Sequence, residues 1–335
     1  MRKIGNLLAQ AMPTGILAGL FPIGLFIPYY HLVGDLEAVH VKHLFPHKNV
    51  REFVADIEFL ASHGHAVGLK DVIDHVQGRA TLRNPSFLLT FDDGYSEMAS
   101  VVAPILLRKG IPAAFFLNPG FIDNAAMSFA NKASLLVEEQ ILDPGRFREG
   151  LERVPAFRDI PPEEAAGRIL AIPYRQRGLV DEIAGAVGLR FDDYLRRRQP
   201  YLSGDQIRDM IRDGFCFGGH SLDHPLYADL SLEDQIQQTL ASVNLVRERF
   251  QLDYSAFAFP HYDRLVTRTF FERIRGSVDV TFGTAGILTD QVAPNLQRIN
   301  FEKTLQPARA ILARQILKKR VYRWLDKDVI SRGEK

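Results

Sequence analysis

Cysteine is almost absent from this sequence. Among 335 residues there is only Cys216, which excludes an intrachain disulfide and a zinc cluster built on cysteines. There is also no charge excess. The net charge is +1, whereas nucleic-acid-binding proteins usually have a strong basic excess. Internal repeats and low-complexity tracts are missing too. With 46% hydrophobic and 24% charged residues, the chain has enough apolar side chains for one large α/β domain or two ordinary ones.

The N-terminal segment, residues 1–23, has a basic start and a long apolar stretch. This pattern fits a signal peptide or a membrane-touching segment. Two features argue against both interpretations. Prolines interrupt the apolar stretch at Pro13, at Pro22 and, just after the segment, at Pro28, and there is no small-x-small cleavage site. An uncleaved segment that touches the membrane therefore stays open, and a cleaved signal is the less favoured alternative.

Strand and helix patterns alternate along most of the chain. Short apolar runs bounded by turn residues predict strands, and segments with apolar residues three or four apart predict helices. Such repeated units imply an α/β fold with a parallel sheet, either open or closed into a barrel. The predicted strands lie at residues 24–33, 86–91, 112–120, 215–221, 256–260 and 280–284.

Two regions do not follow this alternation of strands and helices. Residues 121–200 contain helical patterns with no strand between them, which predicts a helical insertion in a domain that spans residues 24–304. Residues 305–335 contain a basic amphipathic helix. Such a helix usually packs on its domain with a solvated basic face, and the alternative is attachment to anionic lipid.

Two adjacent carboxylates follow the apolar run 86–91. Asp92 and Asp93 come at the carboxyl end of this predicted strand, where α/β folds hold their ligand sites. Like charges side by side repel each other unless a cation, a proton or a substrate neutralises them. Asp-Asp-Gly is also a common solvated turn, so the pair alone leaves both interpretations open.

A histidine pair follows another predicted strand. His220 and His224 are four residues apart, and on a helical turn this spacing puts both rings on one side. With a nearby carboxylate the pair would give three ligands and open positions, as catalytic zinc or iron sites require. The acidic pair and the histidine pair together predict a metal site.

These motifs resemble those of the polysaccharide deacetylase family, carbohydrate esterase family 4. Thr-Phe-Asp-Asp-Gly at 90–94 and His-Ser-Leu-Asp-His at 220–224 match its first two motifs, over a resemblance that covers about 24–120 and 200–300. The resemblance implies a distorted, incomplete (β/α) barrel, here of about seven strands. It also implies that Asp92 is the general base and that Asp93, His220 and His224 hold a divalent metal.

The metal implied by the resemblance is Zn²⁺, although Co²⁺, Ni²⁺ or Fe²⁺ also suit two histidines and an aspartate. The cation would polarise an amide carbonyl and acidify a bound water, and Asp92 would take the proton of that water. The resemblance also places an oxyanion-stabilising backbone N–H just after Pro260, in His261 or Tyr262.

The sequence departs from the family pattern at three places. Ala258 stands where many members have the arginine that tethers the base, and Arg298 is the candidate substitute, unless it is a surface arginine. The late leucine-x-histidine motif has no histidine, so the general acid is expected to be His31, with His261 as the second choice. The family's tryptophan motif is missing, since the single tryptophan, Trp324, lies in the C-terminal helix.

The sequence therefore predicts a metal-dependent hydrolase that removes N-acetyl or similar N-acyl groups from amino sugars of a poly- or oligosaccharide. Tyr30, Pro260 and His261 are expected to contact the sugar. One alternative is a deacylase or deformylase of a lipid- or nucleotide-linked sugar in cell-envelope synthesis, and another is a non-catalytic sugar-binding protein. We expect no nucleic acid partner. The expected location is the cytoplasm, with peripheral contact of the termini at the inner membrane face left open, and the alternative is an exported or membrane-anchored protein.

Overall fold

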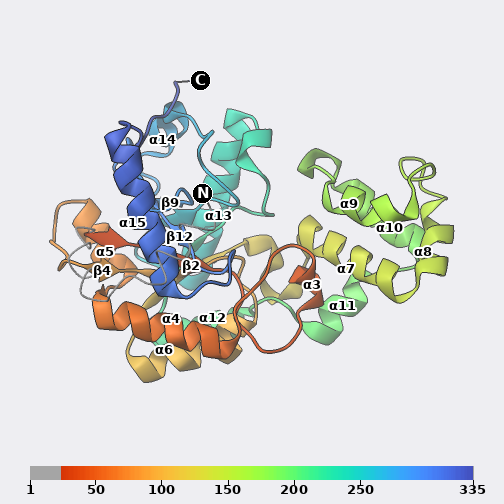
Figure 1. The fold of residues 1–335 in the computed structure, drawn as a ribbon, viewed down its shortest axis with the longest axis horizontal. Helices are drawn as coiled ribbons and strands as arrows, with labels where there is room; N and C mark the ends of the chain where they lie inside the picture. Colours follow the sequence, from red (N-terminus) through yellow and green to blue (C-terminus); the bar gives the residue numbers. More distant parts are fainter. Residues whose placement is uncertain (1–23, 335) are drawn as a thin grey trace.

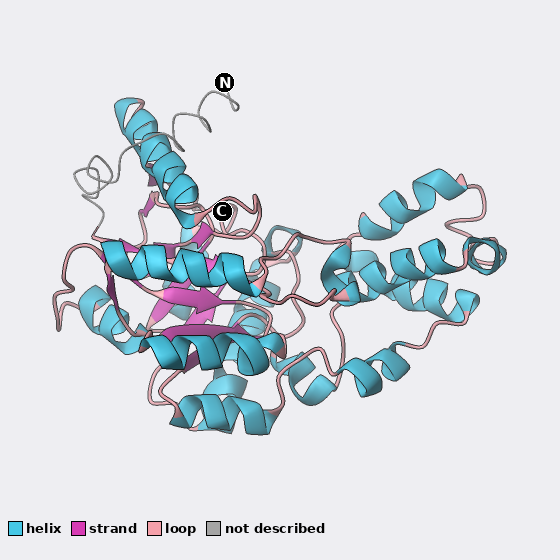
Figure 2. Cartoon of the chain, turned by 60° about the horizontal axis from the view of Figure 1, so that its bottom comes forward, coloured by secondary structure: helices cyan, strands magenta, loops and turns pink. Residues whose placement is uncertain are grey.

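The main body of the protein is a barrel of short parallel strands surrounded by helices (Figure 2). The computed structural model describes residues 24–334. Eight strands follow the order β11-β9-β8-β7-β6-β5-β2-β12, and all neighbouring pairs are parallel. Most of their residues are buried, as expected for a parallel sheet covered by helices. The strands are β2 (Pro28–Tyr30), β5 (Leu89–Phe91), β6 (Ala113–Leu117), β7 (Cys216–Gly219), β8 (Ala256–Ala258), β9 (Val280–Gly283), β11 (Asn295–Gln297) and β12 (Ile299–Asn300).

One segment nearly closes this barrel. Arg298 alone separates β11 from β12, yet β11 pairs with β9 and β12 pairs with β2 at the other end of the strand order. The two ends of the sheet therefore meet at Arg298. The predicted barrel is confirmed, with eight strands instead of about seven because the sequence pattern did not reveal residues 295–300 as strand.

Helices cover the outside of the barrel (Figure 1). Their N-termini use side-chain caps: Asn49, Ser203 and Ser231 each accept a hydrogen bond from a backbone N–H of the first turn. These caps fix where each helix begins after its strand. The helices are α4 (Val50–His63), α5 (Leu69–Val76), α6 (Ala103–Lys109), α12 (Gly204–Arg212), α13 (Leu232–Phe250), α14 (Arg268–Ile274) and α15 (Ala308–Trp324).

Small sheets complete this part of the fold. The strand order β1-β4-β3 forms a three-stranded parallel sheet beside the barrel, and β10 pairs with β13 near the C-terminus. A five-residue π-helix, η1, precedes α6. The bounds are β1 (Leu25–Phe26), β3 (His65–Ala66), β4 (Ser86–Phe87), β10 (Thr289–Asp290), β13 (Val329–Ile330) and η1 (Met98–Val102).

Helices α7 to α11, between β6 and α12, form a helical lobe beside the barrel, at the right of Figure 1. The lobe has its own apolar core, which includes Leu136, Val180 and Ile183, all fully buried. Its helices contain no strand between them, as predicted for 121–200. With α3 (Val39–Lys42), which contacts α7, they are α7 (Phe129–Leu142), α8 (Pro144–Leu151), α9 (Pro162–Leu170), α10 (Gly178–Val187) and α11 (Phe191–Arg198).

The C-terminal helix α15 packs against α4 through its first half, where Ile311, Leu312 and Ile316 are buried. Its last turns leave Val321 and Trp324 exposed. Across residues 24–334, none of the helices has the length and apolar character needed to cross a membrane. The prediction for residues 1–23 lies outside the described residues.

Candidate active site

A tight turn after β5 separates the two adjacent carboxylates. Asp93 and Gly94 both have positive φ angles, 70° and 68°. A Cβ on Gly94 would lie 2.8 Å from a methyl carbon of Leu117, so glycine is needed here for space as well as for conformation. Because of this turn Asp92 and Asp93 present their carboxylates to different partners.

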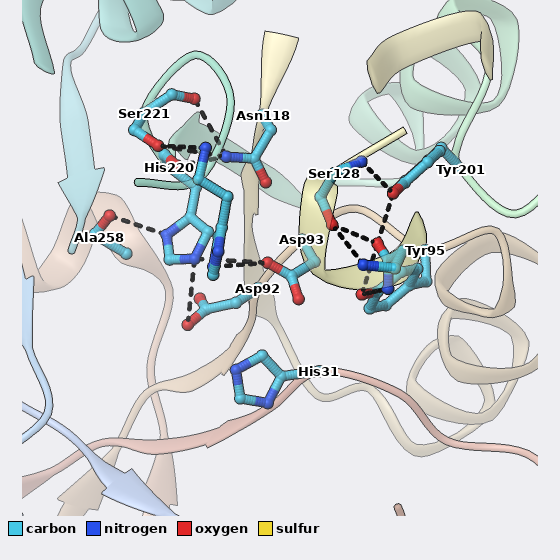
Figure 3. Close-up of polar contacts among 12 residues, drawn as sticks. His31, Asp92, Asp93, Tyr95, Asn118, Ser128, Tyr201, His220, Ser221 and Ala258 are labelled. Atoms are coloured by element: carbon cyan, nitrogen blue, oxygen red, sulfur yellow. Dashed lines mark hydrogen bonds and ion pairs between the residues drawn. The ribbon is translucent and has the colours of Figure 1, made fainter. Parts of the chain in front are cut away.

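The two histidines of the second motif lie on a loop after β7. The expected helical turn is wrong: Ser221 and His224 have φ angles of 65° and 64°, and the next helical residues begin only at Tyr227. Ser221 Oγ accepts a hydrogen bond from the His224 N–H at 3.0 Å, and the Asn118 amide donates to the carbonyls of His220 and Ser221. Sequence reasoning missed Asn118, which follows β6 and holds the loop from a neighbouring strand (Figure 3).

Asp93, His220 and His224 form a compact set of three ligand atoms. Asp93 Oδ1 lies 3.5 Å from His220 Nε2 and 3.3 Å from His224 Nε2. All three atoms are buried and lack a hydrogen-bond partner among the described residues, which is costly unless a further group satisfies them. Ligand atoms about 2.0–2.2 Å from a tetrahedral zinc ion would lie about 3.4 Å apart. The set therefore fits a divalent cation.

A backbone carbonyl of β8 fixes which nitrogen of the His220 ring is free to bind a metal. Its Nδ1 lies 2.8 Å from the Ala258 carbonyl, which can only accept a hydrogen bond, so Nδ1 carries the proton and Nε2 is left to bind. Burial lowers the pKa of His220 to about 4, although the neighbouring Asp92 carboxylate acts in the opposite direction. His220 is thus neutral at physiological pH, as a metal ligand must be.

Asp92 is held by Arg298, the residue between β11 and β12. Arg298 donates two parallel hydrogen bonds to it, from Nη1 to Oδ1 at 2.6 Å and from Nη2 to Oδ2 at 2.8 Å. The arginine is fully buried, so it is no surface residue. Burial alone would raise the pKa of Asp92, but Arg298 and then His220 outweigh it and lower the pKa to about 2. Asp92 stays ionised at neutral pH while its Oδ2 lies 3.9 Å from His220 Nε2.

His31 follows β2 and shares the cavity with Asp92. Its Nδ1 makes a short hydrogen bond with Glu302, and the other oxygen of Glu302 accepts the His31 backbone N–H at 2.9 Å. Burial would lower the pKa of His31, but the Glu302 carboxylate more than offsets it and raises the pKa to about 9. Glu302 was not predicted, because it follows the strand β12 that the sequence pattern did not reveal.

The remaining predicted residues divide between the site and the core. Tyr30 does not contact the cavity: it is fully buried, and its hydroxyl donates to Asp56 at 3.1 Å. Successive strand residues point to opposite faces, so the neighbouring Tyr29 lines the cavity in its place. Pro260 is buried and does not line the cavity either. His261 does line it, whereas the Tyr262 side chain is 41% exposed and lies outside it.

These groups open into one cavity of about 660 Å³ between the barrel and the helical lobe. This volume lies within the range of small-molecule sites. The barrel contributes the polar residues described above, while the lobe contributes an apolar wall that sequence analysis left undefined. That wall consists of Phe129, Ala130, Ala133, Ile169, Leu170 and Ile172.

Similarity to known proteins agrees with this geometry. Residues 79–269, more than half of the chain, match the family model described as polysaccharide deacetylase. The chain belongs to the polysaccharide deacetylase family. A search of curated proteins finds no match.

Solved structures of deacetylases share the fold at low sequence identity. The Streptococcus pyogenes deacetylase PplD in complex with acetate superposes with a TM-score of 0.55 at 13% identity, over 87% of this chain and 98% of that chain. IcaB from Ammonifex degensii gives a TM-score of 0.54 at 17% identity, over 87% and 97% of the two chains. At these identities the likeness concerns the fold.

Proposed function

We propose that this deacetylase-family protein is a metal-dependent hydrolase that removes N-acetyl groups from amino sugars of a poly- or oligosaccharide. The observation that carries the proposal is an ionised carboxylate outside the ligand set, Asp92, beside three ligand atoms that have no hydrogen-bond partner among residues 24–334. A protein that only bound sugar would have no use for that carboxylate.

In this proposal Asp93, His220 and His224 hold the cation, with Zn²⁺ as the first choice and Co²⁺, Ni²⁺ or Fe²⁺ as alternatives. A bound cation of this kind supplies a Lewis acid for the amide carbonyl and lowers the pKa of a water ligand. Asn118 and Ser221 keep the two histidines in place through the loop contacts described above.

Asp92 is the general base of the proposed reaction. Its two bonds to Arg298 fix the carboxylate plane, so that the side chain cannot turn to become a fourth ligand. A fixed base in hydrogen-bond reach of the attacking water takes its proton as the water adds to the carbonyl carbon.

His31 is the proposed general acid. Paired with Glu302, it is protonated at neutral pH and can give its proton to the leaving amine nitrogen when the C–N bond breaks. His261, which also lines the cavity, is the alternative. A backbone N–H of His261 or Tyr262 remains the predicted second donor to the oxyanion.

The test combines metal content, measured by mass spectrometry, with acetate release from N-acetylated oligosaccharides. Wild type should hold one divalent ion per chain, and Asp93→Ala should lose both the ion and activity. Asp92→Asn is the matched control: it should keep the ion and lose activity by about 10²–10⁴-fold. A wild-type protein that takes up no metal, or an Asp92→Asn variant with full activity, would rule the mechanism out.

A further inference from the structure

A second, basic pocket adjoins the catalytic cavity. It has a volume of about 250 Å³ and four basic residues line it: Arg264 after β8, Lys303 after β12, and Arg314 and Lys318 on α15. The two hollows share lining residues, namely Thr284, Asn300 and Lys303. A ligand that occupies the catalytic cavity can therefore extend directly into this pocket.

The positive charge of this pocket has no carboxylate counterpart among the described residues. No aspartate or glutamate lines it, and within residues 24–334 none of the four basic side chains forms an ion pair. Other basic residues near the barrel differ, since Arg298 and Arg332 each bind carboxylates. Lys318 Nζ lies 5.2 Å from the centre of the Tyr322 ring, but no carboxylate among the described residues neutralises any of the four charges.

Three of the four basic groups, Arg264, Arg314 and Lys318, also lie close enough to repel one another. Arg314 and Lys318 are one helical turn apart on α15, a spacing at which like charges destabilise a helix. The pKa of Lys318 is lowered, first by partial burial and then by the charges of Arg264 and Arg314. An anion in the pocket would relieve this repulsion.

We propose that the basic pocket is a subsite for a phosphate or diphosphate group attached to the N-acylated amino sugar. Several convergent cations suit a group that carries more than one negative charge better than a single carboxylate. The inference rests on the proposed function, since the acyl group of the same molecule would lie at Asp92. It narrows the substrate to an amino sugar, alone or at the end of an oligosaccharide, that is linked to a nucleotide or a lipid through phosphate.

The test uses two sugars that differ only in the phosphate: N-acetylglucosamine 1-phosphate and methyl N-acetylglucosaminide. Their binding to the metal-loaded Asp92→Asn protein is measured by calorimetry at 0.15 M salt, where exposed charges are screened over about 8 Å. The phosphate sugar should bind roughly tenfold more tightly or better. Arg314→Gln/Lys318→Gln should abolish that preference.

The matched control is Arg320→Gln/Arg323→Gln, which removes the same charge from exposed positions of α15 outside the pocket and should keep the preference. Equal binding of both sugars, or a preference that survives in the Arg314→Gln/Lys318→Gln variant, would overturn the subsite. Acetate release by the wild type is measured in parallel. If the wild type releases acetate but the two sugars bind equally, the subsite is refuted and the proposed function stands. If the phosphate sugar binds more tightly but no sugar releases acetate, the proposed function is refuted and the subsite stands.

A second arm distinguishes the two sources of phosphate. The same N-acetylated sugar is supplied on uridine diphosphate or on a diphosphate-linked polyprenol in detergent. Faster acetate release from either one than from the methyl glycoside, lost in Arg314→Gln/Lys318→Gln, supports the subsite and identifies the carrier. Equal rates from all three would contradict it.

Discussion

Two buried arginines in this protein bind aspartates in different ways. Arg298 lies inside the barrel, and both terminal nitrogens of its guanidinium group donate to one carboxylate, that of Asp92. Arg332, near the C-terminus, bonds to two carboxylates, those of Asp263 and Asp290, and to the backbone carbonyls of Asp263 and Val266. Both guanidinium groups are inaccessible to solvent.

The difference lies in what the carboxylates face. Asp263 Oδ2 also accepts hydrogen bonds from Asn295 and Gln297, Oδ1 accepts one from the Thr284 N–H, and the residue does not line the catalytic cavity. Asp92 does line it. Successive side chains point to opposite faces along β11 and the residue that follows it. Gln297 therefore points to Asp263, and the next residue, Arg298, points to Asp92. A buried ion pair thus indicates a reactive carboxylate only where one side of the carboxylate stays open.

The largest effect should follow from Arg298→Met. The variant leaves Asp92 buried, unpaired and free to turn, so activity should fall by about a hundredfold or more. Acetate release per folded molecule, with folding checked by circular dichroism, measures this. Arg298→Lys keeps the charge without the two-pronged geometry and should recover only part of the activity. Full activity in Arg298→Met would show that Arg298 does not tether the base.

Arg332→Met should have the opposite effect, with a large loss of stability and little loss of activity. It leaves Asp263 and Asp290 buried without their cation, so the free energy of unfolding should drop by about 3–5 kcal/mol, measured in urea. Activity per folded molecule should stay near that of wild type. The control is Arg273→Met, whose partner Glu233 lies at the surface, and it should change stability by less than about 1 kcal/mol. A large activity loss in folded Arg332→Met would contradict the separation of roles.

A third buried carboxylate, Glu302, has a titratable partner in place of an arginine. In Glu302→Gln the carboxylate that does most to offset the burial of His31 is lost, and only the smaller effects of Asp93 and Asp92 remain, so the pKa of His31 should fall from about 9 toward its ordinary value of about 6.5. A general acid must be protonated, so activity is lost as pH rises through this pKa. The alkaline limb of the pH–rate profile should move to lower pH, and the activity at pH 8 should fall by about thirtyfold. An unmoved limb would exclude His31 as the acid.

Sequence reasoning found the groups that occur in compact motifs. Asp92, Asp93, His220 and His224 each lie within five-residue signatures at the ends of predicted strands, and the strands were found where the sequence has apolar runs. Arg298 was proposed as the tether because the usual arginine position holds Ala258, and the structure does bring Arg298 to Asp92.

The missed features depend on long-range pairing. The strands β11 and β12 have three and two residues, too few for a periodic pattern, so neither the barrel closure nor Glu302 could be read from the sequence. The choice between Tyr29 and Tyr30 depends on strand register, which a run of aromatic residues does not reveal. The apolar wall and the basic pocket bring together side chains from distant segments, which no local pattern records.

The smallest effect that distinguishes the two arginines is a pH dependence of stability. Burial would raise the pKa of Asp263, but Arg332 and the amides of Gln297 and Asn295 lower it. A lowered pKa gives stability that is present above the unfolded value of about 3.9 and is lost as pH falls toward the folded value. In Arg332→Met, burial should dominate and Asp263 should protonate readily. The stability difference between wild type and this variant should therefore narrow between pH 6 and pH 3, whereas a constant difference would mean that the lost free energy does not come from the charge of Asp263.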